Sequence, residues 1–239
     1  MTGQVALDED FHVHSTFSDG ASTLAENVQA ARERGLRTLC LVDHVRRDTA
    51  WLPDFTAAVS RHRRQPGTRV LAGVEAKILD SSGRLDVPPG LDGIDLVLIA
   101  DHQFPADNGP VHPDDMRAAI GYGGITPAEA IERLCDATAN ALGATDRQPL
   151  IAHLFSVLPK IELDETMVPE PLLARLAERV AAAGAMVEVN EKWSCPSART
   201  VTAMARAGVS LVAGSDSHHC RDVGVYRSVR LTVGAGGRT

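Results

Sequence analysis

The amino-acid sequence predicts one α/β domain, built as a barrel of parallel strands with helices outside. Short runs of Val, Leu, Ile and Ala alternate with segments of helical periodicity along the chain, a pattern typical of parallel sheets covered by helices. About seven such strand–helix units occur, which favours a barrel over a doubly wound sheet. The length of 239 residues suits a single barrel domain, so we expect one domain over 1–239.

The expected strands are the apolar runs of the chain. The second of them, RTLCLVDH, has the continuous apolar character of a buried strand. In chain order, the strands are expected at 11–14, 37–44, 68–79, 95–102, 149–154, 185–190 and 209–219.

The expected helices carry recognisable start and stop signals. Thr23 is a plausible N-cap, Glu26 completes a capping box, and Gly35 ends that helix. A second helix has Pro127 in its first turn and Gly143 at its end. The helices are expected at 23–35, 54–64, 126–143, 170–184 and 197–208.

One long segment, 103–125, is rich in Gly, Pro and Asp, and we expect a long loop or lid over one end of the sheet. No GxGxxG motif follows the first strand and no GxxxxGK[ST] motif occurs. A nucleotide-binding Rossmann or P-loop fold therefore has little support.

Composition narrows the classes of function. The net charge of −7, without a basic stripe, argues against a nucleic-acid binder. The four cysteines form no CxxC pair, which suggests reduced thiols and a cytoplasmic protein. The first ten residues do not resemble a signal peptide, and no apolar run approaches the roughly 18 residues of a membrane span, so no membrane partner is expected.

The first expected strand carries two histidines, His12 and His14, on either side of one valine. Side chains alternate faces along a strand, so both imidazoles point the same way and can serve one metal ion. Alone this HxH motif is weak, because nine histidines in 239 residues would produce such a pair roughly a third of the time by chance.

Further polar side chains recur where the other expected strands end. Six of the nine histidines lie at or just beyond the C-terminal end of a strand, and (β/α) barrels build their active sites at that rim. The remaining three, His62, His112 and His219, are not expected to bind metal. The candidates at the other strand ends are His44, Glu75, His102, His153, Glu188, Asn190, Asp216 and His218.

Imidazoles and carboxylates without thiolates favour Zn²⁺, Mn²⁺, Fe²⁺ or a similar ion. Nine candidate ligands are too many for one ion, so we expect two or three divalent ions, with carboxylates such as Glu75 bridging them. The nine candidates are His12, His14, Asp19, His44, Glu75, His102, His153, Asp216 and His218.

These motifs together resemble the PHP (polymerase and histidinol phosphatase) family, from His12 to about Gly224. The resemblance implies a distorted seven-stranded (β/α) barrel, a trinuclear metal centre and hydrolysis of phosphate esters by a metal-bound hydroxide. It implies three ligand sets: His12, His14, Glu75 and Asp216; Asp19, His44 and His218; and Glu75, His102 and His153.

We therefore expect a metal-dependent hydrolase that acts on a small phosphomonoester or nucleotide, with Asp19 or Asp216 donating a proton to the leaving group. Three alternatives stay open: a nuclease-like PHP module, an amidohydrolase-type enzyme that attacks carbon, and a regulatory PHP domain without activity. The candidates for contact with substrate are Arg46, Lys77, Asn190, Lys192 and Arg199.

Overall fold

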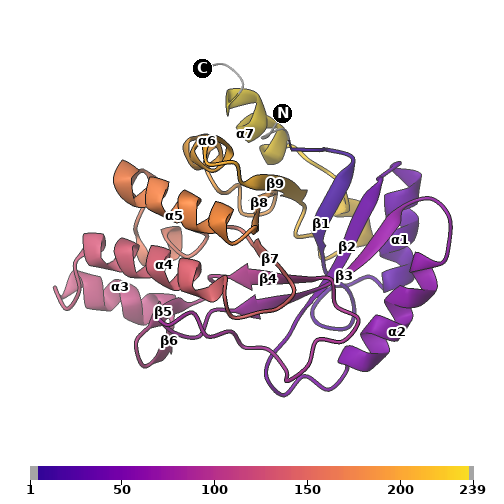
Figure 1. Ribbon diagram of the computed structural model, residues 1–239, viewed down its shortest axis with the longest axis horizontal. Helices are drawn as coiled ribbons and strands as arrows, with labels where there is room; N and C mark the ends of the chain where they lie inside the picture. Colours follow the sequence, from indigo (N-terminus) through magenta and orange to yellow (C-terminus); the bar gives the residue numbers. More distant parts are fainter. Residues whose placement is uncertain (1–4, 237–239) are drawn as a thin grey trace.

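Seven parallel strands form one sheet that curves into a nearly closed barrel, as the computed structural model, which describes residues 5–236, shows (Figure 1). The predicted barrel is therefore confirmed. Residues 1–4, part of the stretch examined for a signal peptide, lie outside the described residues. The strands neighbour one another in the order β1 (Glu9–Val13), β2 (Thr38–His44), β3 (Arg69–Lys77), β4 (Leu96–Ala100), β7 (Gln148–Ile151), β8 (Met186–Asn190) and β9 (Ser210–Gly214).

The barrel closes where β1 meets the chain that leaves β9. The His14 backbone N–H donates to the Ser217 carbonyl at 2.8 Å, and the Ser217 N–H donates to the His12 carbonyl at 3.3 Å. The buried Asp10 carboxylate supports this seam by accepting from the Ser215 N–H at 2.9 Å. The seam brings the HxH motif next to the SDSH motif, although about two hundred residues separate them in the sequence.

Helices cover the outside of the barrel (Figure 1). The capping box predicted for the first helix is present, since Thr23 N–H donates to Glu26 Oε2 at 2.7 Å and Glu26 N–H donates to Thr23 Oγ1 at 3.3 Å. The terminal helix α7 was not expected from the sequence. The main helices are α1 (Leu24–Glu33), α2 (Leu52–Arg63), α4 (Pro127–Ala141), α5 (Glu170–Ala182), α6 (Ala198–Arg206) and α7 (Ser228–Gly236).

The segment 103–125 is not the long loop that its composition suggested. It folds into a hairpin of β5 (Phe104–Ala106) and β6 (Gly109–Val111), followed by α3 (Pro113–Gly121). Asp107 and Asn108 form the hairpin turn between the paired residues Ala106 and Gly109. The Pro and Asp residues of the segment also fill the first turn of the helix, where they are favourable. The loop prediction was therefore wrong, and a lid role stays a prediction.

Aliphatic side chains fill the interior, as the low aromatic content requires. The sheet buries one layer inside the barrel and a larger layer between strands and helices. Among residues 5–236, no helix has the length and apolar character to cross a membrane. The inner layer consists of Phe11, Cys40, Val42, Leu96, Leu98, Ala100, Leu150, Ala152 and Val212.

Candidate metal centre

The structure brings together all nine side chains that the sequence nominated as metal ligands. Each lies near the C-terminal end of a strand or in the segment that follows it, so the parallel sheet places them at one rim of the barrel. Three groups have ligand atoms that lie within 4.8 Å of one another. These groups are His12, His14 and Asp216; His44, Glu75 and His102; and His14, Asp19, His44 and His218.

Glu75 lies at the centre of the cluster and is almost fully buried. Its Oε1 atom is 2.8 Å from His102 Nε2 and 2.9 Å from His153 Nε2. Its Oε2 atom is 2.9 Å from His44 Nδ1 and 3.4 Å from the Nε2 atom of each imidazole in the HxH motif. One carboxylate thus faces five imidazoles, the arrangement expected of a ligand that bridges ions.

The two imidazoles of the HxH motif face each other directly. His12 Nε2 is 3.0 Å from His14 Nε2, and His14 Nε2 is 3.3 Å from Asp216 Oδ1. Ligands at about 2.0–2.1 Å from one ion stand about 2.9–3.4 Å apart in octahedral or tetrahedral geometry. These separations therefore fit donor atoms that share a cation.

Asp19 joins the cluster from the loop that follows β1. Its Oδ2 atom is 3.4 Å from His44 Nε2 and 3.3 Å from His218 Nε2, and its Oδ1 atom is 3.7 Å from His14 Nδ1. The Asp19 side chain is 53 % exposed. This group therefore forms the open edge of the cluster.

Three imidazoles are oriented so that Nε2 is left for a metal ion. His12 Nδ1 lies 2.9 Å from Glu188 Oε1, and His218 Nδ1 lies 2.9 Å from the Asp216 carbonyl. Carboxylate and carbonyl oxygens only accept hydrogen bonds, so both Nδ1 atoms carry the proton. His153 Nδ1 likewise lies 2.9 Å from Ser156 Oγ. This is the usual tautomer of a metal-ligating histidine.

Two buried atoms in the cluster have no hydrogen-bond partner among the described residues, His14 Nδ1 and Glu75 Oε2. An unsatisfied buried polar atom costs about 1–3 kcal/mol, and both atoms point toward other candidate ligands. Divalent cations fit this donor set because they would satisfy both atoms at once.

Electrostatics also favour cations here. Burial acts to raise the pKa of Glu75, but positive charge on His102 and His12 outweighs burial and holds it well below the ordinary value. Divalent ions bound in place of the protons on these imidazoles would supply the same positive charge. Burial lowers the pKa of His14 to about 4, which leaves the imidazole neutral and able to donate a lone pair.

The pKa values of Asp19 and Asp216 bear on their expected roles. Burial acts to raise both, but neighbouring histidines outweigh it: His44 lowers the pKa of Asp19, and His12 lowers the pKa of Asp216. Both groups are therefore carboxylates near neutral pH. That state suits metal ligands better than the proton donors that the sequence suggested.

Glu188 forms hydrogen bonds with several residues of the cluster and its surroundings. It was not predicted as a ligand. Its Oε1 atom pairs with His12 Nδ1 and accepts from Asn190 Nδ2 at 3.0 Å, while its Oε2 atom accepts from the His153 N–H at 2.7 Å. Such outer partners orient metal ligands and raise their basicity. Period-two spacing put Glu188 on the correct face, but its partners are distant in sequence.

Two further buried carboxylates brace the cluster. Asp101 accepts from Ser156 Oγ at 2.6 Å, and Ser156 in turn contacts His153. Asp43 accepts from the Ser15 N–H at 3.0 Å and the Ser18 N–H at 3.1 Å. Asp43 therefore fixes the loop that carries Asp19. The sequence placed both carboxylates at strand ends without showing what they contact.

Gly214 lies against the Glu188 side chain, so a substitution at Gly214 tests the role of Glu188. A Cβ atom at this position would overlap the Glu188 carboxylate. We expect Gly214→Ala to displace Glu188, to destabilise the protein by about 1–3 kcal/mol as overpacking does, and to weaken metal binding. Chemical denaturation and metal titration measure both effects. Gly184→Ala is an unsuitable control because of its positive φ of 62°, whereas Gly143→Ala meets only one atom, at 3.9 Å, and should change neither quantity.

Two cavities flank the cluster. One, of about 700 Å³, is lined by His44, His102, Arg46 and Lys77 among others. Lys77 Nζ donates to Gln103 Oε1 at 2.9 Å. Arg46 and Lys77 thus line a cavity beside the cluster, and their contact with substrate stays a prediction.

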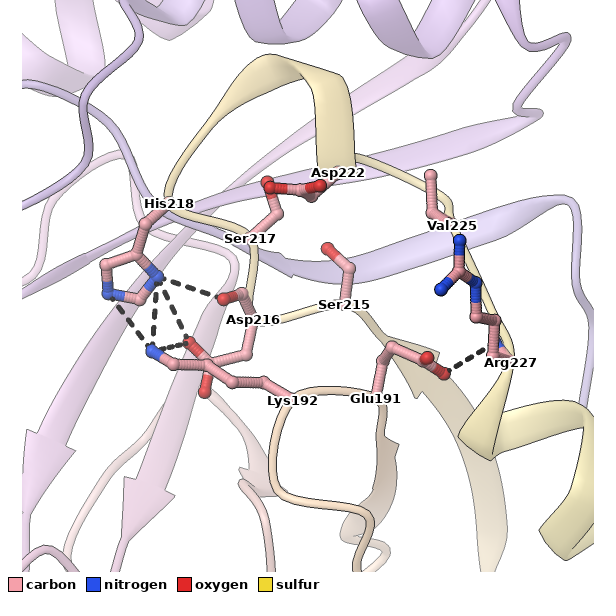
Figure 2. Close-up of a pocket in the computed structure, with 9 residues that line it drawn as sticks. All are labelled: Glu191, Lys192, Ser215, Asp216, Ser217, His218, Asp222, Val225 and Arg227. Carbon is pink, nitrogen blue, oxygen red and sulfur yellow. Dashed lines mark hydrogen bonds and ion pairs between the residues drawn. The ribbon is translucent and has the colours of Figure 1, made fainter.

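The second cavity, of about 460 Å³, lies on the side of Asp216 and His218 (Figure 2). Lys192 Nζ lies 3.4 Å from Asp216 Oδ1 and 3.3 Å from His218 Nδ1, at the boundary between the cavity and the cluster. Arg227 lines the opposite side of this cavity in Figure 2. Sequence reasoning missed Arg227 because it lies beyond the last expected strand.

Two of the expected substrate-binding residues line neither of these two cavities. Asn190 is buried, and its side chain donates to Glu188 and accepts from the Trp193 N–H at 2.8 Å. Arg199 donates to Glu170 Oε1 and to the Val168 carbonyl, both at 2.8 Å. Both predictions therefore need correction: Asn190 supports the cluster and Arg199 ties α6 to the start of α5.

The three histidines set aside in the sequence lie outside the three ligand groups. His62 is on α2. His112 caps α3, with Nδ1 accepting from the Asp114 N–H at 3.2 Å. His219 Nδ1 accepts from the Arg221 N–H at 3.2 Å.

The barrel and its histidine–carboxylate cluster agree with the resemblance to the PHP family that the motifs indicated. Sequence comparison supports the same resemblance. Residues 10–110 match a family model described as the PHP domain. Similarity to curated relatives extends over most of the chain. The chain is therefore similar to PHP-domain proteins, with the domain match over residues 10–110.

Individual relatives show how large the similarity in sequence and fold is. A protein of Caldanaerobacter subterraneus subsp. tengcongensis named "Probable phosphatase" is 27% identical, over 93% of this chain and 81% of its own. A "Probable phosphatase" of Vibrio vulnificus is 28% identical, over 91% and 80%. Among solved structures, one similar fold is that of histidinol phosphate phosphatase from Lactococcus lactis, complexed with Zn, L-histidinol and phosphate. It aligns over 96% of this chain and 93% of that chain, with a TM-score of 0.65 and 16% identity. This alignment supports the fold.

Proposed function

We propose that this protein is a metal-dependent phosphoesterase that hydrolyses a small phosphorylated molecule, a phosphomonoester or a nucleotide. The observation that carries the proposal is the convergence of eight candidate ligands with the ninth, Glu75, at the barrel rim. The curated relatives are named "Probable phosphatase", and these names and the PHP domain match support the same reaction class.

The proposed ligands are the six strand-end histidines together with Asp19, Glu75 and Asp216, and the proposed ions are two or three of Zn²⁺, Mn²⁺ or Fe²⁺. Bound there, such ions lower the pKa of water and neutralise phosphate oxygens. Glu188 and Asp101 hold the imidazoles in their ligating tautomers and orientations. Lys192, beside Asp216, supplies a further positive charge for the phosphate.

Lys192 and Lys77 provide a matched test of which cavity receives the phosphate. A charge-assisted hydrogen bond contributes about 1.5–3 kcal/mol, so we expect Lys192→Ala to lower kcat/KM about 10–100-fold. Lys77→Ala, in the other cavity, should have the smaller effect. The reverse order, measured by steady-state kinetics on one phosphomonoester, would move the phosphate to the cavity of Arg46.

The alternative reactions make different demands on the site. An amidohydrolase commonly places a lysine between its metals, but Lys77 Nζ pairs with Gln103 instead. Assays of the metal-loaded protein on phosphomonoesters, cyclic nucleotides, short oligonucleotides and amides separate the classes. Release of inorganic phosphate from small phosphomonoesters supports the proposal. Cleavage of oligonucleotides or amides alone, or no turnover by fully loaded protein, would contradict it.

Two expectations about cellular context are part of the proposal. We propose a cytoplasmic location from the four cysteines, which are free in the structure. We also propose a small phosphorylated molecule as the partner and no stable complex with nucleic acid, because the net charge is −7.

A further inference from the structure

We infer that Trp193 is a positioning residue for Asp216, and that its indole N–H sets which oxygen of that carboxylate faces the metal cluster. This inference deepens the proposed function and rests on it. Trp193 Nε1 donates to Asp216 Oδ2 at 2.9 Å, whereas Asp216 Oδ1 faces His14 Nε2 at 3.3 Å. Trp193 therefore holds Oδ2 outside the cluster, while Oδ1 faces the HxH motif and also lies 3.4 Å from Lys192 Nζ.

The backbone at Asp216 adopts an uncommon conformation. Asp216 has a φ of 51°, in the left-handed region that few residues other than glycine adopt. Such conformations persist only where the surroundings determine them, and they concentrate at functional sites. Here the conformation turns the carboxylate into the cluster, where the Trp193 hydrogen bond can hold it.

Trp193 is itself held by the network beneath the cluster. Its backbone N–H donates to Asn190 Oδ1 at 2.8 Å, and Asn190 Nδ2 donates to Glu188 Oε1 at 3.0 Å. The next residue, Ser194, has a φ of 53° and turns the chain after the indole. One continuous set of hydrogen bonds thus runs from Glu188 to Asp216 and joins ligands on β1 and after β9.

The surroundings of the ring argue against a simple packing role. Trp193 is 40 % exposed, one of the few large apolar side chains at the surface. Lys160 Nζ lies 4.1 Å from the ring centroid, a cation–π contact worth about 0.5–1 kcal/mol at an exposed position. The His153 ring centroid is 6.1 Å away. The ring is therefore fixed between Lys160 and the cluster, with its N–H directed inward.

An indole suits this position for chemical reasons. Its Nε1–H can only donate, so it cannot ligate a metal ion and compete with Asp216. It is also uncharged, so it adds no positive charge to that of Lys192, which lies 3.4 Å from Asp216 Oδ1. Trp193 can thus orient Asp216 without reducing its charge.

The direct test replaces Trp193 with Phe, which keeps a ring and removes the donor. Loss of an outer partner of a metal ligand typically costs 10–100-fold in metal affinity, and we expect that loss for one ion of the set when Zn²⁺ or Mn²⁺ is titrated against a chelating indicator. Excess metal should restore the full number of ions bound per chain. Trp51→Phe is the matched control, because Trp51 packs against Phe17 and Phe55, and it should leave metal affinity unchanged.

A spectroscopic measurement covers the case in which Trp193→Phe fails to fold. Trp51→Phe leaves Trp193 as the single tryptophan, since the chain has two. We expect its fluorescence to change as Zn²⁺ is added, and Asp216→Asn to abolish that response. Unchanged fluorescence on metal binding, or unchanged metal affinity in Trp193→Phe, overturns the inference and leaves the proposed function standing. Failure of the wild-type protein to bind any ion overturns both.

Discussion

Replacing Glu75 with Gln is expected to remove most of the bound metal and to lower kcat/KM more than 100-fold. Glu75 faces five imidazoles through its two oxygens, and an amide keeps the shape but supplies neither the charge nor two equivalent oxygens. Outer-shell changes alone cost up to about 100-fold, so loss of the central ligand should cost more. Elemental analysis and phosphate release measure the two effects.

His62→Ala is the control for this experiment. His62 lies on α2, outside the ligand groups, so its replacement should change neither metal content nor activity. Equal losses in Glu75→Gln and His62→Ala would show that the assays report general instability. Full metal content and activity in Glu75→Gln would contradict the assignment of Glu75 as the bridging ligand.

Removal of metal is expected to lower the thermal stability of the wild-type protein by about 5–10 °C. A ligand present at 100 times its Kd stabilises the folded state by about 2.7 kcal/mol, and about 1 kcal/mol shifts Tm by 2–4 °C in a protein of this size. The physical reason is the buried carboxylate charge of Glu75 and Asp216, which bound cations would offset.

Differential scanning calorimetry with a chelator, and again after dialysis and addition of Zn²⁺ or Mn²⁺, measures this shift. Restoration by a divalent ion distinguishes metal loss from direct effects of the chelator. An identical Tm in all three samples would mean that no ion is bound to the folded state.

The barrel and the candidate ligands were predictable because both follow from local rules. Strand alternation put His12 and His14 on one face, and parallel strands brought His44, Glu75 and His102 to one rim. No long-range information was needed, since every strand of a parallel barrel ends at the same rim.

The supporting contacts were not predictable, since they depend on partners far apart in sequence. Glu188 contacts His12 across 176 residues, and Trp193 contacts Asp216 across 23. Arg199 shows the opposite error: it follows a strand as a phosphate ligand might, but nearby acceptors at Glu170 and Val168 bind its guanidinium.

The hairpin and helix in 103–125 were missed for a different reason. Glycine, proline and aspartate were interpreted as loop formers, although the same residues form hairpin turns and helix starts. Their order decides between the two: Asp107 and Asn108 stand between two short extended runs, and Pro113 and Asp114 stand at the first turn of α3.

The most direct test of the central claim is the number of metal ions bound and the distance between them. X-ray absorption spectroscopy on protein loaded with Zn²⁺ or Mn²⁺, combined with elemental analysis, gives both. The account predicts at least two ions per chain, about 3.5–4 Å apart as in other multi-metal hydrolytic sites, with imidazole nitrogens among the ligands. A single isolated ion, or none, would contradict it.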